Sequence, residues 1–159
     1  MAQTQLRGLI EFTRVVTIRT GVVLGSQGAL PRMVIPFKFY VGGHLGKGTQ
    51  WLPWIHIQDL IRMLEFIIEH DELTGPVNGT SPAPVRMKDF SKIIGEVLKR
   101  PSWFPVPEFV LKIVLGQMSE MLIHGQRAIP QKISDIGFEF IFPDLKSALE
   151  DALGNRNVV

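Results

Sequence analysis

The hydrophobic positions along this chain change their period several times, and each change predicts a new element. The first is a run of β-branched apolar residues: Val15, Val16 and Ile18. Such a run, apolar on both faces and bounded by Gly21, is typical of a buried strand with neighbours on either side. A loop rich in glycine and proline follows, and residues 33–40 then predict a helix in spite of Pro36. Residues 51–57 return to an extended pattern of aromatic and β-branched residues.

From Asp59 onward the period becomes helical. One face collects the apolar side chains Leu60, Met63, Leu64, Ile67 and Ile68. Glu65 falls on the opposite face, and Asp59 is placed to cap the first turn or to stabilise it by its charge. A brief strand at 77–79 leads into a second amphipathic helix, with apolar positions at Met87, Phe90, Ile93, Ile94, Val97 and Leu98. This alternation of strand and helix favours an α/β fold with a parallel sheet.

Beyond Pro101 the pattern predicts a small, mostly helical region. Apolar residues repeat at helical spacing over 111–122, and a short helix at 130–136 is closed by Gly137. A final helix has its apolar face at Leu145, Ala148, Leu149 and Ala152. Between these two helices three aromatic residues alternate with other side chains, at Phe138, Phe140 and Phe142. That alternation predicts a strand or extended strap that lays three rings onto a core.

Charge and composition narrow the function. The 159 residues include 17 basic and 15 acidic side chains spread along the chain, so we expect no nucleic-acid partner. Cysteine is absent, which excludes disulfides, cysteine-bound zinc and thiol nucleophiles. The longest apolar run, at 107–118, is interrupted by polar residues and too short to span a bilayer, so we expect no membrane partner. Together these features lead us to expect a cytoplasmic protein.

Several short motifs then point to a known family. They lie at 19–25 (RTGVVLG), 53–60 (PWIHIQDL), 75–79 (GPVNG), 125–127 (GQR) and 137–140 (GFEF). In this order and spacing they resemble the extended, epimerase-type short-chain dehydrogenases/reductases, in the subgroup that ends in its own small helical domain. The resemblance covers nearly the whole chain, from Thr13 to Leu153.

The resemblance implies an NADP-linked enzyme with a carboxy-terminal substrate domain. The expected fold is therefore α/β, the carboxy-terminal part of a Rossmann-like parallel sheet followed by a small, mostly helical substrate or lid subdomain. We expect a divergent amino-terminal segment at 1–12, the second half of the NAD(P)-binding domain at 13–100, and the small helical domain at 101–159.

The family's chemical machinery is missing from this sequence. The glycine-rich turn that seats a pyrophosphate on a helix amino terminus does not occur. The catalytic Tyr-x-x-x-Lys pair is also absent, because the only tyrosine, Tyr40, is followed four positions later by His44. We therefore expect no catalytic residue here, and interpret the chain as the carboxy-terminal portion of an NADP-dependent oxidoreductase or nucleoside-diphosphate-sugar-epimerase-like protein that is inactive alone. The alternative is a non-catalytic binding or interaction module that retains the lid fold.

Four residues are candidates for contact with the cofactor. Thr20, Gly21, Val22 and Val23 follow the first strand, and open α/β sheets bind ligands at the carboxyl ends of their strands. The resemblance implies that their backbone touches the nicotinamide carboxamide of NADP. The alternative is a strand-to-loop turn that needs Gly21 only for its geometry.

Three further residues are candidates for contact with the substrate: His56, Gln126 and Arg127. His56 is either such a contact or a core histidine with a satisfied hydrogen bond. Arg127 either presents its planar guanidinium to an anionic substrate or packs its stem and pairs with a carboxylate. The histidines at 44, 56, 70 and 124 form no ligand motif, so we expect no metal.

One expectation concerns partners. The strands that should flank the run at 15–18 belong to the half of the family's sequence that this chain lacks. Unpaired backbone groups on an apolar strand recruit other chains. We therefore expect a partly exposed sheet edge and self-association through it.

Overall fold

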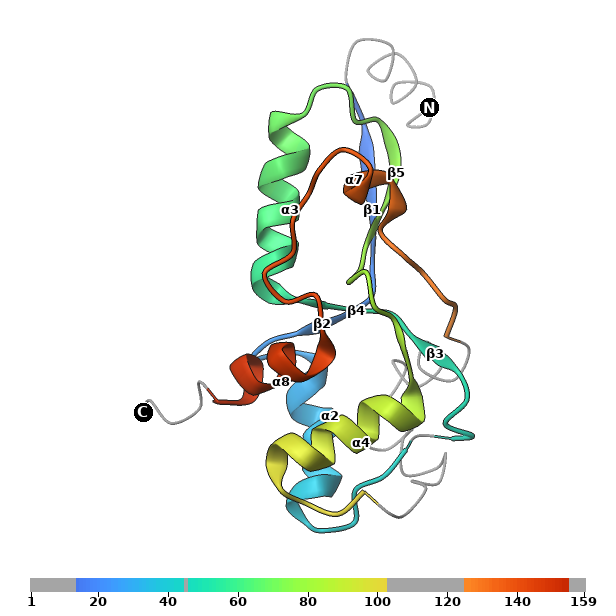
Figure 1. Cartoon of the computed structure of the whole chain (residues 1–159), viewed down its shortest axis with the longest axis vertical. Helices are drawn as coiled ribbons and strands as arrows, with labels where there is room; N and C mark the ends of the chain where they lie inside the picture. The colour runs from blue at the N-terminus through green and yellow to red at the C-terminus, as the bar shows by residue number, and fades with distance from the viewer. Residues whose placement is uncertain (1–13, 45, 103–124, 155–159) are drawn as a thin grey trace, which may run out of the picture.

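The structure, a computed structural model, describes residues 14–44, 46–102 and 125–154. In chain order its elements are β1 (Val16–Thr20), β2 (Val22–Leu24), α2 (Ala29–Lys38), β3 (Trp51–Leu52), β4 (Trp54–His56), α3 (Ile57–Glu69), β5 (Gly75–Gly79), β6 (Val85–Arg86), α4 (Met87–Leu98), α7 (Gln131–Ser134) and α8 (Leu145–Gly154) (Figure 1). The helix predicted over 111–122 and the segment 1–12 lie outside the described residues.

The strands pair as the α/β prediction requires. β1 runs parallel to β5 and β2 runs parallel to β4, while β3 and β6 form a short antiparallel ribbon that the sequence did not predict. Because only Gly21 separates β1 from β2, the two form nearly one strand that exchanges β5 for β4 as its partner. The expected α/β fold class is confirmed.

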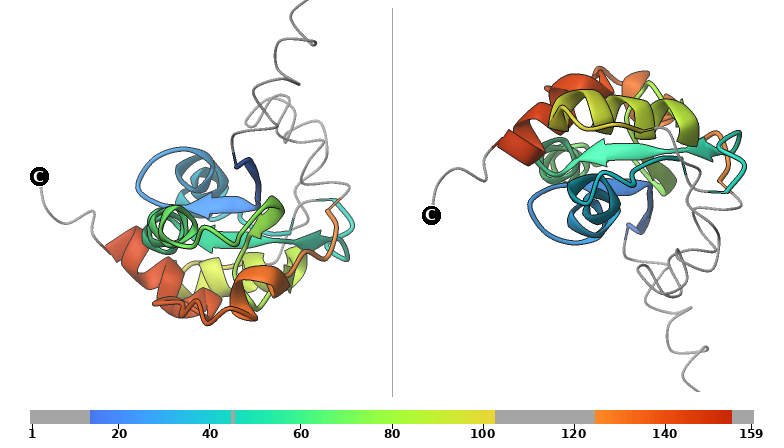
Figure 2. Two further views of the ribbon diagram at one scale, coloured as in Figure 1. Left: turned by 90° about the horizontal axis from the view of Figure 1, so that it is seen from above. Right: turned by 90° about the horizontal axis from the view of Figure 1, so that it is seen from below.

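Helices cover the strands in layers. In the views from above and from below, α4 and α8 lie on one side of β4, and α2 lies on the other (Figure 2). We call the apolar cluster built from these elements the first core; its buried side chains include Leu24, Leu30, Val34, Phe37, Trp54, Met87, Phe90, Ile94 and Leu149. The second core lies between α3, β5 and α7, with buried side chains from Ile55, Met63, Ile67, Leu73, Val77, Ile133 and Phe138. Within the described residues, every helix is too short or too polar to form a membrane span.

The helix predicted at 33–40 has different bounds. It begins four residues earlier, at Ala29, because Pro31 falls in the first turn, where a backbone N–H needs no helical partner. It ends at Lys38, and the backbone of Tyr40 turns to a φ of 61°. The amides of residues 39–41 then donate to Pro36 and Phe37 carbonyls and close the helix end.

The face of α3 was partly mispredicted. Met63 and Ile67 are buried as expected, whereas Leu64 and Ile68 are 42% and 71% exposed. The helix carries two apolar stripes, and period alone does not say which of them meets the sheet. We call the exposed one the outer stripe; it consists of Ile57, Ile61, Leu64 and Ile68. The extended pattern predicted over 51–57 also ends one residue early, since Ile57 already belongs to the helix.

The remaining elements agree with their patterns. α4 buries Met87, Phe90 and Ile94, and α8 buries all four of its predicted apolar residues. The aromatic strap at 138–142 forms no strand, and its rings reach both cores. β1 is less buried than a buried strand should be: Val16 and Ile18 are half-buried and Val15 is 48% exposed.

The carboxy-terminal elements do not stand apart from the rest. α7 packs beside β5 in the second core, and α8 packs beside α4 in the first. Since the residues before 101 and after 125 share both cores, the domain boundary at 101 stays a prediction.

Candidate functional site

The turn between β1 and β2 lies at the carboxyl end of β1, where the strand changes partner. The Gly21 amide donates to the Gly79 carbonyl at 3.1 Å, and the Val22 amide donates to the Pro53 carbonyl at 2.8 Å. The turn is thus fixed from both sides, by the end of β5 and by the residue before β4.

Gly21 is required by a close approach of two backbones. A Cβ atom at this position would lie 2.5 Å from the Pro53 carbonyl oxygen, a contact that no side chain can make without moving the backbone. Thr20 is exposed, and Gly21, Val22 and Val23 are half-buried. The close approach of Pro53 therefore explains the structural need for glycine, while the contact of residues 20–23 with a cofactor stays a prediction.

Two buried hydroxyl residues follow β5, beside this turn. The Ser81 hydroxyl accepts from the Ala83 amide and donates to the Pro143 carbonyl. The Thr80 hydroxyl is buried and has no hydrogen-bond partner among the described residues. The sequence pattern did not single out either residue. The available signal was their position directly after a parallel strand that ends beside the predicted turn.

His56 lies elsewhere, in the interior at the start of α3. Its Nδ1 accepts from the Gln58 amide at 3.3 Å, which makes His56 the cap of the helix. With Nδ1 as acceptor, the neutral ring carries its proton on Nε2, which lies 3.2 Å from an Asp151 carboxylate oxygen. The two groups form an ion pair only when the ring is protonated. The ring also contacts Phe142, with centroids 4.0 Å apart. These contacts are those of a core histidine, while the substrate role stays an untested prediction.

Burial governs the protonation of His56. Removal from water lowers the pKa of the imidazole below its usual value, and the carboxylates of Asp151 and Asp59 oppose that shift. The neutral form is therefore the one that the fold accommodates best.

Asp59 does more than stabilise the first turn of α3. It is completely buried, and its two carboxylate oxygens accept from the amides of Ile141 and Phe142 at 2.7 and 2.9 Å. The Arg62 guanidinium lies 3.7 Å away and offsets the buried charge. Asp59 thus fixes the aromatic strap against the start of α3.

Arg127 and Gln126 are both exposed. The Arg127 guanidinium lies 5.3 Å from the centre of the Trp51 ring, and the Arg86 guanidinium lies 3.8 Å from the same ring. Among the described residues neither arginine pairs with a carboxylate, and both lie over the aromatic face of Trp51. The geometry leaves Arg127 with hydrogen-bond donors that an anion could use.

The candidate residues therefore occupy three places: the turn at 20–23, the buried cluster around His56, and the exposed arginine beside Trp51. The contacts described above do not bring the last two together. Within 14–44, 46–102 and 125–154 no three potential metal-ligating side chains come together.

Comparison with known proteins supports one family. The family described as a domain of unknown function (DUF1731) matches residues 106–152. The epimerase family protein YfhF of Bacillus subtilis is 47% identical over 146 residues, which are 92% of this chain and 48% of that protein. The chloroplastic SDR39U1 homolog of Arabidopsis thaliana is 43% identical over 86% of this chain and 40% of its own length. The chain spans about half the length of the curated relatives it matches.

Solved structures agree. The human epimerase family protein SDR39U1, crystallised with NADPH, superimposes with a TM-score of 0.81 at 37% identity, covering 90% of this chain and 49% of that one. A nucleoside-diphosphate sugar epimerase from Corynebacterium glutamicum gives a TM-score of 0.71 at 27% identity, covering 97% of this chain and 29% of that one.

Parallel strand pairs, their covering helices and these likenesses define a Rossmann-like α/β protein of the short-chain dehydrogenase/reductase class. Within that class the chain belongs to the epimerase family and corresponds to the carboxy-terminal part of an extended member.

Proposed function

We propose that this chain supplies the nicotinamide-facing turn and the substrate side of an NADP-dependent, epimerase-like oxidoreductase. The observation that carries the proposal is the reachable turn at 20–23, held where one strand changes partner at the carboxyl end of a parallel pair. Ligands of open α/β sheets bind at such switch points. The human relative crystallised with NADPH supports the choice of cofactor.

The turn fits one end of the cofactor. The amides of Gly21 and Val22 are already engaged within the chain, so the carboxamide of a nicotinamide would meet the remaining main-chain groups of residues 20–23. NADP, when bound, supplies or accepts a hydride. The chain's own residues orient the ring. The glycine-rich turn and the Tyr-x-x-x-Lys pair that would hold the pyrophosphate and move the proton are absent from this sequence.

On the substrate side, Arg127 is the best-placed of the three candidates. Its guanidinium is exposed and lacks a carboxylate partner among the described residues, so it suits an anionic group. Gln126 lies beside it and is also exposed. His56 is enclosed by protein and would act on a substrate only through Asp151 or the start of α3.

The second candidate function is a non-catalytic binding module that keeps the lid fold. The extent of the first core favours it, because a chain that closes such a core can persist without the rest of the family's sequence. The oxidoreductase function requires NADP to bind, whereas the binding module does not.

Calorimetric titration with NADPH tests the proposal. For this chain alone we expect a dissociation constant no lower than about 1 mM, which corresponds to a binding free energy of only ~4 kcal/mol. Co-expression with the amino-terminal portion of the Bacillus subtilis relative should bring the dissociation constant to micromolar values, because that portion carries the missing half of the fold. Micromolar binding by this chain alone would contradict the division of the site, and no binding by the complex would favour the module.

A further inference from the structure

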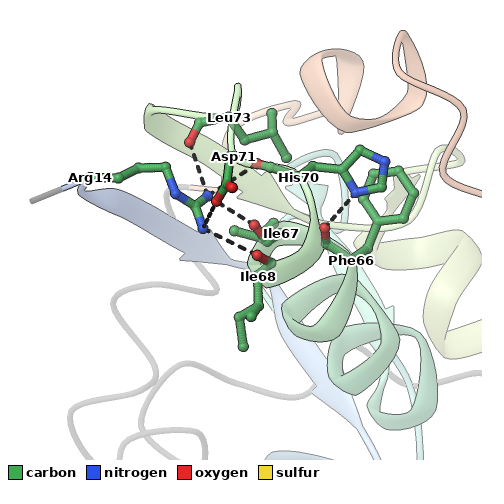
Figure 3. Close-up of polar contacts among 7 residues, drawn as sticks. All are labelled: Arg14, Phe66, Ile67, Ile68, His70, Asp71 and Leu73. Atoms are coloured by element: carbon green, nitrogen blue, oxygen red, sulfur yellow. Dashed lines mark hydrogen bonds and ion pairs between the residues drawn. The ribbon is translucent and has the colours of Figure 1, made fainter.

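The carboxyl end of α3 is closed by an arginine from another part of the chain. The Arg14 guanidinium donates to the carbonyls of Ile67, His70 and Leu73 at 2.9, 3.1 and 3.2 Å (Figure 3). A carboxylate oxygen of Asp71 lies 3.6 Å away. The last carbonyls of a helix lack helical partners, so one cation here satisfies several of them at once. The charge of Arg14 is thereby used within the molecule.

The carboxyl ends of α2 and α4 are closed by their own backbone instead. After each helix two amides donate back to carbonyls of its last turn, at 2.8 to 3.1 Å. Such an ending requires one residue in the left-handed conformation, a place that glycine usually takes. Here Tyr40 and Lys99 take it, with φ of 61° and 53°. Among the described residues they are the only ones besides glycine with a positive φ.

The choice of these two residues indicates that their side chains are used. Glycine adopts the left-handed conformation without steric cost, so it would close either helix more easily. Residues that keep a side chain in this conformation cluster at functional sites. The Arg100 guanidinium lies 4.2 Å from the centre of the Tyr40 ring and so connects the two helix ends. Both ends lie at the bottom of the molecule in Figure 1.

Four apolar side chains are exposed at this end of the molecule. Ile35, Phe39, Tyr40 and Val41 are 40%, 73%, 56% and 55% exposed. We call these four residues the α2 tip. Three of them are consecutive and follow the last residue of α2 directly. Isolated exposed apolar residues are ordinary, whereas a contiguous group marks a site of interaction.

Four cations accompany the α2 tip: Arg32, Lys38, Lys99 and Arg100. The first three are exposed and have no hydrogen bond or ion pair with any other described residue. Residues 25–58 contain neither Asp nor Glu. Glu96, in the last turn of α4, lies 3.9 Å from the Lys92 ammonium, which offsets its charge. The tip therefore combines exposed apolar side chains with unpaired positive charge.

We propose that the α2 tip and its cations form a peripheral docking site for a bilayer surface that contains anionic lipid. Phe39 and Val41 enter the boundary between headgroups and acyl chains, and the Tyr40 ring lies at the level of the headgroups. The cations attract the negative surface of the bilayer. A peripheral contact needs no membrane-spanning run, and the lack of such a run was the reason to expect no membrane partner. The docking site requires no bound cofactor, so this inference is independent of the proposed function.

The size and charge of the site favour a bilayer over a protein. A specific protein–protein interface takes about 20–30 residues from each side, far more than this tip offers. A second copy of this chain would place the same cations opposite one another across a two-fold axis. The start of β1, where self-association is expected, lies at the opposite end of the long axis, so a neighbour there leaves the tip open (Figure 1).

The test is sedimentation of the 159-residue chain with lipid vesicles. The chain should bind vesicles of phosphatidylcholine and phosphatidylglycerol more tightly than vesicles of phosphatidylcholine alone, and added salt should weaken that binding. Phe39→Asp should weaken it at least tenfold, because it places a charge at the inserted position. Leu64→Asp is the matched control, since Leu64 is an exposed apolar residue on the outer stripe, and it should leave the binding unchanged. The melting temperature of each variant verifies that it is folded.

Two glycine variants separate a role in binding from a role in folding. Tyr40→Gly and Lys99→Gly each relieve a left-handed residue, so their melting temperatures should not fall. Lys99→Gly should nevertheless weaken binding to the anionic vesicles about fivefold, as expected for the loss of one cation near such a surface. Failure to bind the anionic vesicles, or equal binding to phosphatidylcholine alone, would overturn the proposal. The same holds if Leu64→Asp weakens binding as much as Phe39→Asp does.

Discussion

The two cores of this molecule differ in how completely the chain covers them. The first core encloses Trp54, Leu30 and Phe90 almost entirely, with helices on both sides of β4. The second core is smaller, and its strand residues Val16 and Ile18 remain half-buried. Its covering helix turns an apolar stripe to solvent. The difference indicates that this chain closes the first core by itself, whereas the second core ends at a partly exposed apolar surface.

The largest expected effect is the loss of a ring from the first core. Phe90→Ala should reduce the free energy of unfolding by about 3–5 kcal/mol, since the ring is fully buried and its removal leaves a cavity. Urea denaturation measures this. Lys92→Ala, on the exposed face of the same helix, should cost under about 0.5 kcal/mol. Similar losses at both positions would show that the first core is not closed.

The next effect concerns the strap that joins the two cores. Asp59→Asn should cost about 1–3 kcal/mol, because the carboxylate accepts two backbone amides and an asparagine offers only one oxygen to them. Denaturant unfolding of Asp59→Asn is compared with that of Glu139→Gln, an exposed substitution in the strap. The comparison separates the loss of this pairing from general effects of charge. If Asp59→Asn is neutral, the strap is held by its rings instead.

A smaller effect should depend on pH. Since burial lowers the pKa of His56 in the folded chain, the unfolded chain takes up a proton first as the pH falls. Stability should therefore be complete above the ordinary histidine value of about 6.5 and decline as the pH falls through that value towards the lowered one. Melting temperatures between pH 7.5 and pH 5, compared with those of His56→Gln, measure it. If the stability of His56→Gln declines with falling pH as steeply as that of the parent chain, another group causes the effect.

The smallest effect is expected on the outer stripe. Leu64→Ala should reduce the free energy of unfolding by less than about 1 kcal/mol, whereas Met63→Ala should reduce it by about 2–5 kcal/mol. The reason is that Met63 is fully buried and Leu64 is not. Urea denaturation of both variants sharpens the contrast between the two faces of one helix. Equal losses would mean that the outer stripe is covered after all.

The success of the predictions from sequence also differed between the two cores. The closed first core has helices with one apolar face each, so the periods of α4 and α8 predicted their buried residues. α3 has two apolar stripes, and choosing between them requires knowledge of what lies beside it. For the same reason Leu64 was assigned to the core, although it is 42% exposed.

The need for Gly21 was evident from its place after a strand, although its reason, the approach of Pro53, depends on residues 32 positions away. Thr80 and the Trp51–Arg86 contact were missed, because single polar residues after a strand and an antiparallel ribbon of two residues per strand carry little pattern. The roles of His56, Gln126 and Arg127 towards a substrate stay predictions.

The hydrogen bonds between Arg14 and the carbonyls at the carboxyl end of α3 also bear on the order of folding (Figure 3). They connect positions 53–59 residues apart, so closing that loop costs chain entropy before the contacts can repay it. Contacts of such long range form late, after the local turns of α3 already exist. The end of α3 beside β1 should therefore be among the last amides of this chain to gain protection from exchange with solvent, and among the first to lose it.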